Sequence, residues 1–236
     1  MSRACVVLLP GLLCDEAVWR HQRSALASAD CFIPSYGDAN DLGDMARGVL
    51  ANVPAGRFSV AGHSMGGRVA LEIMKLAPER VERLALLDTG VDPIAPGEAG
   101  TQERDKRLAL LQIAREHGMR SMGAQWARGM VHEDRIDTPV FAEILDMIDR
   151  RTPDVFAAQI HALLNRPDAT PVLGTLRCPT MFLCGRQDAW SPLARHERMH
   201  EMCPGSALVV IEHSGHMSTM EQPEAVSRAL VAWMSR

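Results

Sequence analysis

The sequence lacks any run of about 20 apolar residues, which is the length that a helix needs to span a bilayer. It also lacks an excess of basic residues, because 29 acidic and 25 basic residues leave a formal net charge of −4. Without a basic patch there is no electrostatic footprint for nucleic acid. We therefore expect no membrane and no nucleic acid among the partners, whereas a small-molecule substrate, including an anionic one, is compatible with this charge.

No CxxC pair occurs among the six cysteines, and a chain of 236 residues is too long for a disulfide scaffold. Cys5, Cys31 and Cys184 stand in or beside apolar segments, where a free cysteine behaves as a small hydrophobic residue. We expect reduced thiols, a cytoplasmic location, and neither a metal nor another cofactor. The sequence leaves the oligomeric state open.

The apolar segment Ala4–Leu9 near the N-terminus could be mistaken for part of a secretory signal. Pro10 and Gly11 interrupt it, and Leu12 and Leu13 stand where a cleavage site needs small residues. We expect a buried first strand there instead.

Hydrophobic residues make up 47% of the chain and charged residues 23%, which is ordinary for a globular protein. A chain of this length buries roughly 70% of the surface that it exposes when unfolded. The length favours one compact domain with an insertion over two complete enzymatic domains.

Short apolar segments that end at Gly, Pro, Asp or His alternate with segments of helical spacing. This alternation predicts a doubly wound, mainly parallel α/β sheet, whose strands are covered by helices on both faces. The predicted strands are Cys5–Leu9, Cys31–Ser35, Phe58–Ala61, Leu84–Leu87, Thr180–Cys184 and Leu208–Ile211. The predicted helices between and after them are Ala17–Ala27, Leu42–Leu50, Gly66–Leu76, Pro192–Met202 and Pro223–Trp233.

The alternation breaks off between Val91 and Leu176, where several helices follow one another without a strand. An all-helical insertion between two strands is expected above the carboxyl edge of the sheet, where open α/β sheets bind ligands. We interpret residues 91–175 as a helical cap and residues 1–90 with 176–236 as the core; a purely structural helical subdomain is the alternative. The cap helices are predicted at Glu103–His117, Ser121–Met130, Pro139–Arg150 and Pro153–Asn165.

The segment Gly62–Gly67 fits G-x-S-x-G directly after a predicted strand and before a predicted helix. Such a sharp turn strains the backbone at the serine and leaves no room for flanking side chains, which is why glycines are needed. The turn lifts the Ser64 hydroxyl clear of the sheet, beside the positive end of the following helix. Ser64 is therefore the candidate nucleophile, against the alternative of a glycine-rich turn with an incidental serine.

A serine nucleophile needs a general base, and the base needs a group that orients it. His216 follows the predicted strand Leu208–Ile211 and so lies at the same edge as Ser64, with His213 as its rival. His63 adjoins Ser64 but points to the opposite side of an extended strand. The remaining histidines, His21, His117, His132, His161, His196 and His200, are expected to be solvated.

Asp188 follows the predicted strand Thr180–Cys184 and is the candidate carboxylate, with Asp88 as its rival. An oxyanion hole needs two donors. One is expected from the backbone N–H of Met65, directly after the nucleophile. The other is expected from the N–H of Leu12, since a glycine precedes it and lets the main chain approach a substrate carbonyl.

Together these residues resemble the α/β-hydrolase superfamily, in its capped branch of esterases and lactonases, and among these the small enol-lactone hydrolases and carboxylesterases. The resemblance favours Asp188 over Asp88 and His216 over His213, and it assigns Leu12 and Met65 to the oxyanion hole. The chain has Pro10-Gly11 where relatives often have His-Gly, and it starts almost at the first strand, so about six strands are expected. The matching segments are Leu8–Gly11 with Trp19, Gly62–Gly67, Gly185–Asp188 with Pro192, and Gly215–His216 followed by Glu221–Pro223.

The predicted reaction is hydrolysis of a carboxylic ester, a lactone or a thioester through an acyl-enzyme on Ser64. Trp126, Met130, Met147 and Trp190 are candidate apolar walls of the substrate site, against the alternative that they only pack in the core. Two alternatives stay open, a non-enzymatic ligand-binding protein and a lyase or C–C bond hydrolase that acts on an anionic small molecule. Arg68 supports the lyase, because it resembles the carboxylate-binding arginine of menaquinone-pathway lyases of this fold; a surface arginine on an amphipathic helix is the alternative.

Overall fold

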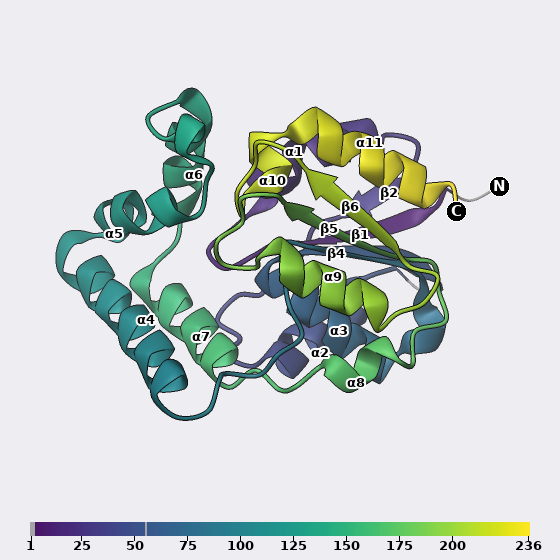
Figure 1. The fold of residues 1–236 in the computed structure, drawn as a ribbon, viewed down its shortest axis with the longest axis horizontal. Coiled ribbons are helices and arrows are strands. Elements are labelled where there is room, and N and C mark those ends of the chain that lie inside the picture. Colours follow the sequence, from purple (N-terminus) through teal and green to yellow (C-terminus); the bar gives the residue numbers. More distant parts are fainter. Residues whose placement is uncertain (1–2, 55) are drawn as a thin grey trace.

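The computed structural model describes residues 3–54 and 56–236, and at its centre lies a sheet of six parallel strands (Figure 1). Their order is β2-β1-β3-β4-β5-β6, so the order reverses beside β1. Open α/β sheets bind ligands outside the carboxyl ends of the strands at such a reversal. The predicted α/β fold is confirmed. The strands are β1 Cys5–Leu9, β2 Asp30–Phe32, β3 Phe58–His63, β4 Val81–Leu87, β5 Thr180–Gly185 and β6 Ala207–Ile211.

The central strands form from continuous apolar segments because both faces of the sheet are covered. Every residue of β3 and of β5 is buried. β2 is shorter than the predicted strand Cys31–Ser35 and ends at Phe32. It pairs with β1 alone, and Pro34 offers no N–H to continue a ladder.

Helices cover the two faces of the sheet as separate layers, with α1, α10 and α11 on one face and α2, α3, α8 and α9 on the other (Figure 1). The predicted helix Ala17–Ala27 is divided into a 3-10 turn and a short helix. Two helices of four residues each, α8 and α10, were not predicted from the sequence. The bounds are η1 Glu16–Trp19, α1 Arg20–Ala25, α2 Leu42–Asn52, α3 Met65–Leu76, η2 Pro78–Arg80, α8 Thr170–Leu173, α9 Leu193–Glu201, α10 Ser218–Glu221 and α11 Pro223–Met234.

Between β4 and β5 the chain forms a run of helices that lies beside the carboxyl ends of the strands, toward which the strand arrows point in Figure 1. Within the described residues, this run contains no strand. Its first helix begins at Glu98, earlier than the predicted Glu103. The elements are α4 Glu98–His117, α5 Met119–Trp126, η3 Ala127–Gly129, η4 Glu133–Arg135, α6 Pro139–Asp149 and α7 Pro153–Leu164.

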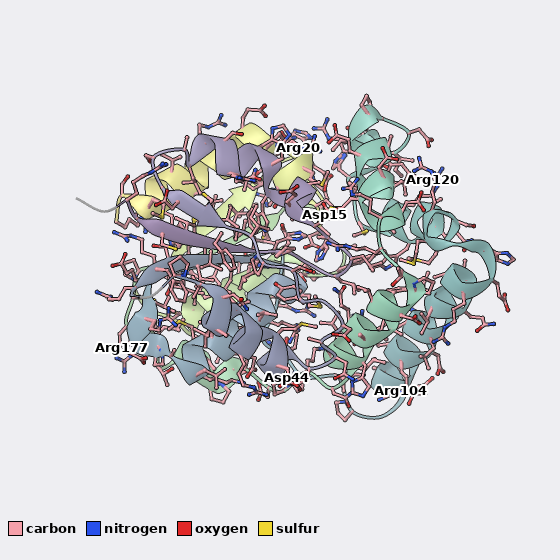
Figure 2. The ribbon with its side chains drawn as sticks, turned by 180° about the vertical axis from the view of Figure 1, so that it is seen from behind. Asp15, Arg20, Asp44, Arg104, Arg120 and Arg177 are labelled. Atoms are coloured by element: carbon pink, nitrogen blue, oxygen red, sulfur yellow. The ribbon has the colours of Figure 1, made fainter. Side chains whose placement is uncertain are left out.

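The outer surface of these helices is charged. Seen from behind in Figure 2, Arg104 on α4 and Arg120 on α5 lie at the surface, and both are exposed. Over the part of the chain that the structure describes, no helix combines the length and the apolar character required to cross a bilayer.

Candidate active site

Ser64 lies between the last residue of β3 and the first residue of α3. Its backbone has φ 53° and ψ −116°, a region that residues other than glycine rarely adopt. The surrounding chain holds this conformation from two sides: the Ser64 N–H donates to the Leu87 carbonyl at 2.9 Å, and the Thr89 hydroxyl donates to the Ser64 carbonyl at 2.7 Å. The hydroxyl of Ser64 is thereby presented at the carboxyl edge of the sheet.

Glycines around Ser64 are required by close backbone contacts. A Cβ on Gly62 would lie 2.3 Å from the Gly66 carbonyl oxygen, and a Cβ on Gly66 would lie 2.2 Å from the Leu9 carbonyl oxygen. A Cβ on Gly11 would lie 3.2 Å from the Ser64 Cβ, so the first loop passes directly over the serine.

Ser64, His216 and Asp188 form one chain of hydrogen bonds. His216 Nε2 lies 2.8 Å from Ser64 Oγ, and His216 Nδ1 lies 2.8 Å from Asp188 Oδ2. The other carboxylate oxygen, Oδ1, accepts the N–H groups of Trp190 and Ser191, each at 2.8 Å. The three side chains come from segments of the chain that follow β3, β6 and β5, and the parallel sheet brings these segments to one edge.

His216 and Asp188 shift each other's pKa values in the directions expected for an imidazole paired with an anionic carboxylate. Burial alone lowers the pKa of His216, but the charge and hydrogen bond of Asp188 outweigh burial and raise that pKa above its ordinary value of 6.5. Burial likewise raises the pKa of Asp188, but His216 and the two backbone N–H groups outweigh it and hold this pKa below its ordinary value.

The rivals of His216 and Asp188 take no part in this chain of hydrogen bonds. His213 is exposed, and its ring packs at the edge of His132, with 5.9 Å between ring centroids. Asp88 is completely buried, where it accepts the Gly185 N–H at 2.9 Å and the Ser218 hydroxyl. Burial, followed by the nearby charge of Asp188, raises the pKa of Asp88 well above its ordinary value.

His63 supports the segment that carries His216. Its Nε2 lies 2.8 Å from the His216 carbonyl oxygen, and since a carbonyl can only accept, Nε2 carries the proton. Burial, followed by the neighbouring His216, lowers the pKa of His63 to about 4, so the ring is neutral at neutral pH.

His196 was expected to be solvated, and this expectation is wrong. The side chain is completely buried, and its Nε2 accepts the Thr89 N–H at 3.2 Å. Because Thr89 also binds the Ser64 carbonyl, His196 supports the turn that carries the serine. Helical spacing placed His196 on α9 but did not show that the sheet packs against that face.

Glu221 is a second residue whose position was not foreseen. Its buried carboxylate accepts three backbone N–H groups, from Gly215 at 3.0 Å, Met217 at 3.0 Å and His132 at 2.7 Å. In addition, the His216 N–H donates to the Met130 carbonyl at 2.6 Å. The loop that carries His216 is thus tied both to α10 and to the helical run before β5.

Leu12 and Met65 both line the cavity, and in the described part of the chain neither backbone N–H has a hydrogen-bond acceptor. Their neighbour Leu13 donates its N–H at 2.8 Å to Oε1 of Gln159, a buried side chain on α7. The two residues that were expected to stabilise an oxyanion therefore line the same cavity as Ser64, and α7 holds the loop that contains Leu12.

A cavity of about 450 Å³ opens above Ser64. Trp126, Met130 and Trp190 line it, as expected for its apolar walls. The Trp190 ring centroid lies 5.2 Å from that of Trp126 and 5.1 Å from that of His216. Arg68 also lines the cavity, whereas Met147 does not: it is buried in the core because α6 turns its apolar face inward.

All six cysteines are free. Cys14 lines the cavity, but burial, followed by the charge of Asp15, raises the pKa of its thiol to about 12, so it is protonated at neutral pH. Within residues 3–54 and 56–236, no three His, Cys, Asp or Glu side chains form a group that could hold a metal ion.

A model of the alpha/beta hydrolase family matches residues 6–229 of the chain. The sequence is 27% identical over 233 residues to the pimeloyl-(acyl-carrier protein) methyl ester esterase of Nitrosomonas europaea, a match that covers 93% of this chain and 91% of that protein. Three other relatives are longer proteins, of which this chain spans 64%, 63% and 66%.

Solved structures are similar over the full length of the chain. A thermophilic esterase from Thermogutta terrifontis, with malate bound, has a TM-score of 0.85 at 28% identity and covers 99% of this chain and 90% of its own. The enol-lactonase from Burkholderia xenovorans LB400 has a TM-score of 0.87 at 19% identity, with 100% and 93% covered. At 19% identity, the similarity to the enol-lactonase shows a shared fold and no more.

Proposed function

The chain belongs to the alpha/beta hydrolase family, and from this premise we propose that it is a serine hydrolase that cleaves a carboxylic ester, or a lactone or thioester, of a small molecule. The observation that carries the proposal is the hydrogen-bonded chain Asp188–His216–Ser64, with 2.8 Å at each link, at the floor of a cavity. The proposed roles are nucleophile for Ser64, general base for His216 and orienting carboxylate for Asp188.

The reaction follows from this arrangement. Asp188 holds the proton on His216 Nδ1, so Nε2 is free to accept the proton of Ser64 Oγ while that oxygen attacks the ester carbonyl. The N–H groups of Leu12 and Met65 would stabilise the negative charge on the carbonyl oxygen, and losing one such donor typically costs about 3–4 kcal/mol. His216 then protonates the leaving alcohol. In the second half, His216 takes a proton from water as the water attacks the acyl carbonyl, and it returns that proton to Ser64 Oγ as the carboxylic acid leaves.

The helical run from α4 to α7 is proposed to act as a cap that determines which esters enter. It contributes Trp126 and Met130 to the cavity, and through Gln159 it reaches the loop of the proposed oxyanion hole. Residues 91–175 are thus proposed as the cap and residues 1–90 with 176–236 as the core. Met147 supports the cap from within and has no proposed contact with substrate.

The relatives support ester chemistry in particular. The Nitrosomonas europaea protein is an esterase, and so is the solved Thermogutta terrifontis protein, at 27% and 28% identity. A small-molecule ester is accordingly the proposed substrate class. The cytoplasmic location that was expected from the cysteines stays a prediction.

Labelling with a fluorophosphonate, combined with a panel of esters, lactones and thioesters, tests the proposal. We expect one phosphonate adduct on Ser64 and turnover of at least one class of substrate. Ser64→Ala should lose both, by about 10⁶-fold in kcat, because no other group can form the acyl-enzyme. Ser24→Ala, which changes an exposed serine of α1, is the matched control. Full activity of Ser64→Ala would contradict the assignment.

A second candidate, cleavage of a C–C bond or a lyase reaction on an anionic molecule, would use the same residues. It is favoured by Arg68, whose side chain lines the cavity four positions after the serine. A lyase of this kind should turn over p-nitrophenyl esters poorly. Phosphonate labelling of Ser64 without turnover of any ester, lactone or thioester would favour this second candidate.

A further inference from the structure

The residues that line the cavity above Ser64 fall into two chemically different sets. One is apolar and contains Leu12, Trp126, Met130 and Trp190. The other carries five cationic side chains and one carboxylate, an excess of four positive charges, although the whole chain has a formal charge of −4. We call this second set the cationic wall; its members are Arg68, Glu103, Lys106, Arg107, Arg166 and Arg195.

The single carboxylate of the cationic wall is fully engaged. Glu103 accepts two hydrogen bonds from Arg166, at 2.7 Å and 2.8 Å, and one from Arg107 at 3.0 Å. These contacts outweigh burial and lower the pKa of Glu103 to about 2, so it is anionic at neutral pH. Glu103 thus neutralises one of the two arginines that share it, and it contacts none of the other cations of the wall.

Arg195 lies close to the segment that holds Ser64. A Cβ on Gly90 would lie 2.5 Å from Arg195 Cδ, and Gly90 directly follows Thr89, whose hydroxyl binds the Ser64 carbonyl. Arg195 donates to the Trp190 carbonyl at 3.1 Å. Its nearest carboxylate, Asp92 at 3.6 Å, also contacts Arg198. The charge of Arg195 is therefore only partly compensated.

Arg68 and Lys106 have no carboxylate within 4.0 Å in the described part of the chain. Arg68 donates to the Asp92 carbonyl at 2.9 Å, which satisfies one donor but no charge. Burial, followed by the charges of Arg166 and Arg195, lowers the pKa of Arg68 to about 9. The guanidinium stays charged at neutral pH but is held against other cations, a cost that a bound anion would relieve.

We propose that the cationic wall binds a free carboxylate of the substrate, so that the ester cleaved at Ser64 carries a second, ionised acid group. The inference rests on the proposed function and names its substrate class. Guanidinium groups bind carboxylates through paired N–H donors, and these interactions are strong where the site excludes water. A cavity of about 450 Å³ admits a small molecule of this kind, with its apolar portion against the tryptophans.

Matched esters test this directly. Monoethyl adipate ends in a carboxylate and ethyl adipamate in an uncharged amide, on the acyl side of the ester. The pair 4-acetoxybutanoate and 4-acetoxybutanamide has the same difference on the alcohol side. We expect kcat/KM to be at least about tenfold higher for the charged member of one pair, the value of one charge-assisted hydrogen bond. The pair that shows the preference identifies the side of the ester that faces the cationic wall.

Variants connect the preference to the wall. Arg195→Gln and Arg68→Gln should each lower the ratio of kcat/KM between charged and amide ester by about tenfold, mainly through KM, because each removes a binding partner of the carboxylate. Arg195→Lys should keep part of the ratio. Arg104→Gln, an exposed residue on the same helix as Lys106 (Figure 2) that does not line the cavity, should leave the ratio unchanged. Thermal unfolding and the rate of phosphonate labelling report whether each variant is folded.

The outcomes separate this inference from the proposed function. Equal turnover of both members of both pairs, or a ratio that neither arginine variant changes, overturns the cationic wall as a substrate site while Ser64 remains the nucleophile. If no ester is cleaved, calorimetry on Ser64→Ala decides the inference alone: binding of a charged ester at least about tenfold tighter than its amide sustains it, and equal binding rejects it.

Discussion

Two buried carboxyl groups lie near His216, and their surroundings move their pKa values in opposite directions. Asp188 accepts two backbone N–H groups and the imidazole, which lower its pKa, whereas burial raises the pKa of Asp88. When the surroundings of two carboxyl groups move their pKa values apart in this way, the two groups have different roles. Asp188 is the anion beside His216, and Asp88 joins β5 to α10 through Gly185 and Ser218.

Substitution of either aspartate distinguishes these roles. Asp188→Asn should lower kcat by about 10⁴, because an amide favours the wrong imidazole tautomer. Asp88→Asn should lower kcat by less than about tenfold, since Asp88 bonds to Gly185 and Ser218 rather than to His216, and burial raises its pKa and so favours the neutral form that Asn mimics. Steady-state kinetics on the two variants provide the measurement. A larger loss in Asp88→Asn than in Asp188→Asn would reverse the assignment.

The pH profile should report the partnership between His216 and Asp188. A protonated imidazole cannot accept the Ser64 proton, so kcat/KM falls as pH drops through the pKa of His216. Because that pKa is raised above 6.5, the midpoint of the acid limb should lie above pH 6.5. In Asp188→Asn burial remains while the carboxylate is lost, so the residual activity should show a midpoint at lower pH. An unmoved midpoint would argue against Asp188 as the partner.

At the turn between β3 and α3, backbone atoms leave no room for a side chain. Gly66→Ala would bring a Cβ to 2.2 Å from the Leu9 carbonyl oxygen. We therefore expect the free energy of unfolding to fall by at least about 1–3 kcal/mol, and the activity to be lost because the turn that holds Ser64 is displaced. Gly48→Ala in α2 has nothing within 4 Å of the added Cβ and should stabilise by roughly 0.5–1 kcal/mol. Urea titration measures both, and a stable, active Gly66→Ala protein would contradict the close approach.

The loop that carries His216 depends on Glu221. Glu221→Gln should weaken the three hydrogen bonds that the carboxylate accepts from the N–H groups of Gly215, Met217 and His132. An amide has only one accepting oxygen, so it cannot accept all three. We expect kcat to fall by about tenfold with little change in KM, and the protein to lose about 1–3 kcal/mol of stability. Glu224→Gln, at an exposed position of α11, is the matched control. Equal behaviour of the two variants would remove Glu221 from this role.

The cavity and the whole molecule carry charge of opposite sign. The chain has a formal net charge of −4, whereas the cationic wall that lines the cavity above Ser64 is positively charged. If the wall attracts the substrate, kcat/KM for monoethyl adipate should fall about three- to tenfold between about 0.05 M and about 0.5 M NaCl, and that for ethyl adipamate should stay nearly constant. Parallel salt dependence for both esters would mean that the field of the wall does not act on the substrate.

Much of the fold and several parts of the site could be predicted from the sequence, because their signals are local. Apolar segments of strand length, bounded by turn residues, specify strands that are buried on both faces. Gly62–Gly67 identifies a strained turn, and Asp188 and His216 each follow a strand that ends at the same edge. β2 was predicted too long, because apolar character continues past Phe32 although Pro34 ends the ladder.

What only the tertiary structure decided is which distant side chains share a space. Helical spacing did not separate Met147, which packs in the core, from Trp126 and Met130, which line the cavity, since burial depends on what each helix packs against. The cationic wall combines arginines and a lysine from α3, α4 and α9 and from the segment after α7. Arg68 was a candidate from the sequence, but no local pattern placed the other cations beside it. Local sequence pattern determines the helices and strands, because it acts between residues that are close along the chain. Which charged side chains line the cavity together depends on the packing of distant segments, which no short segment encodes.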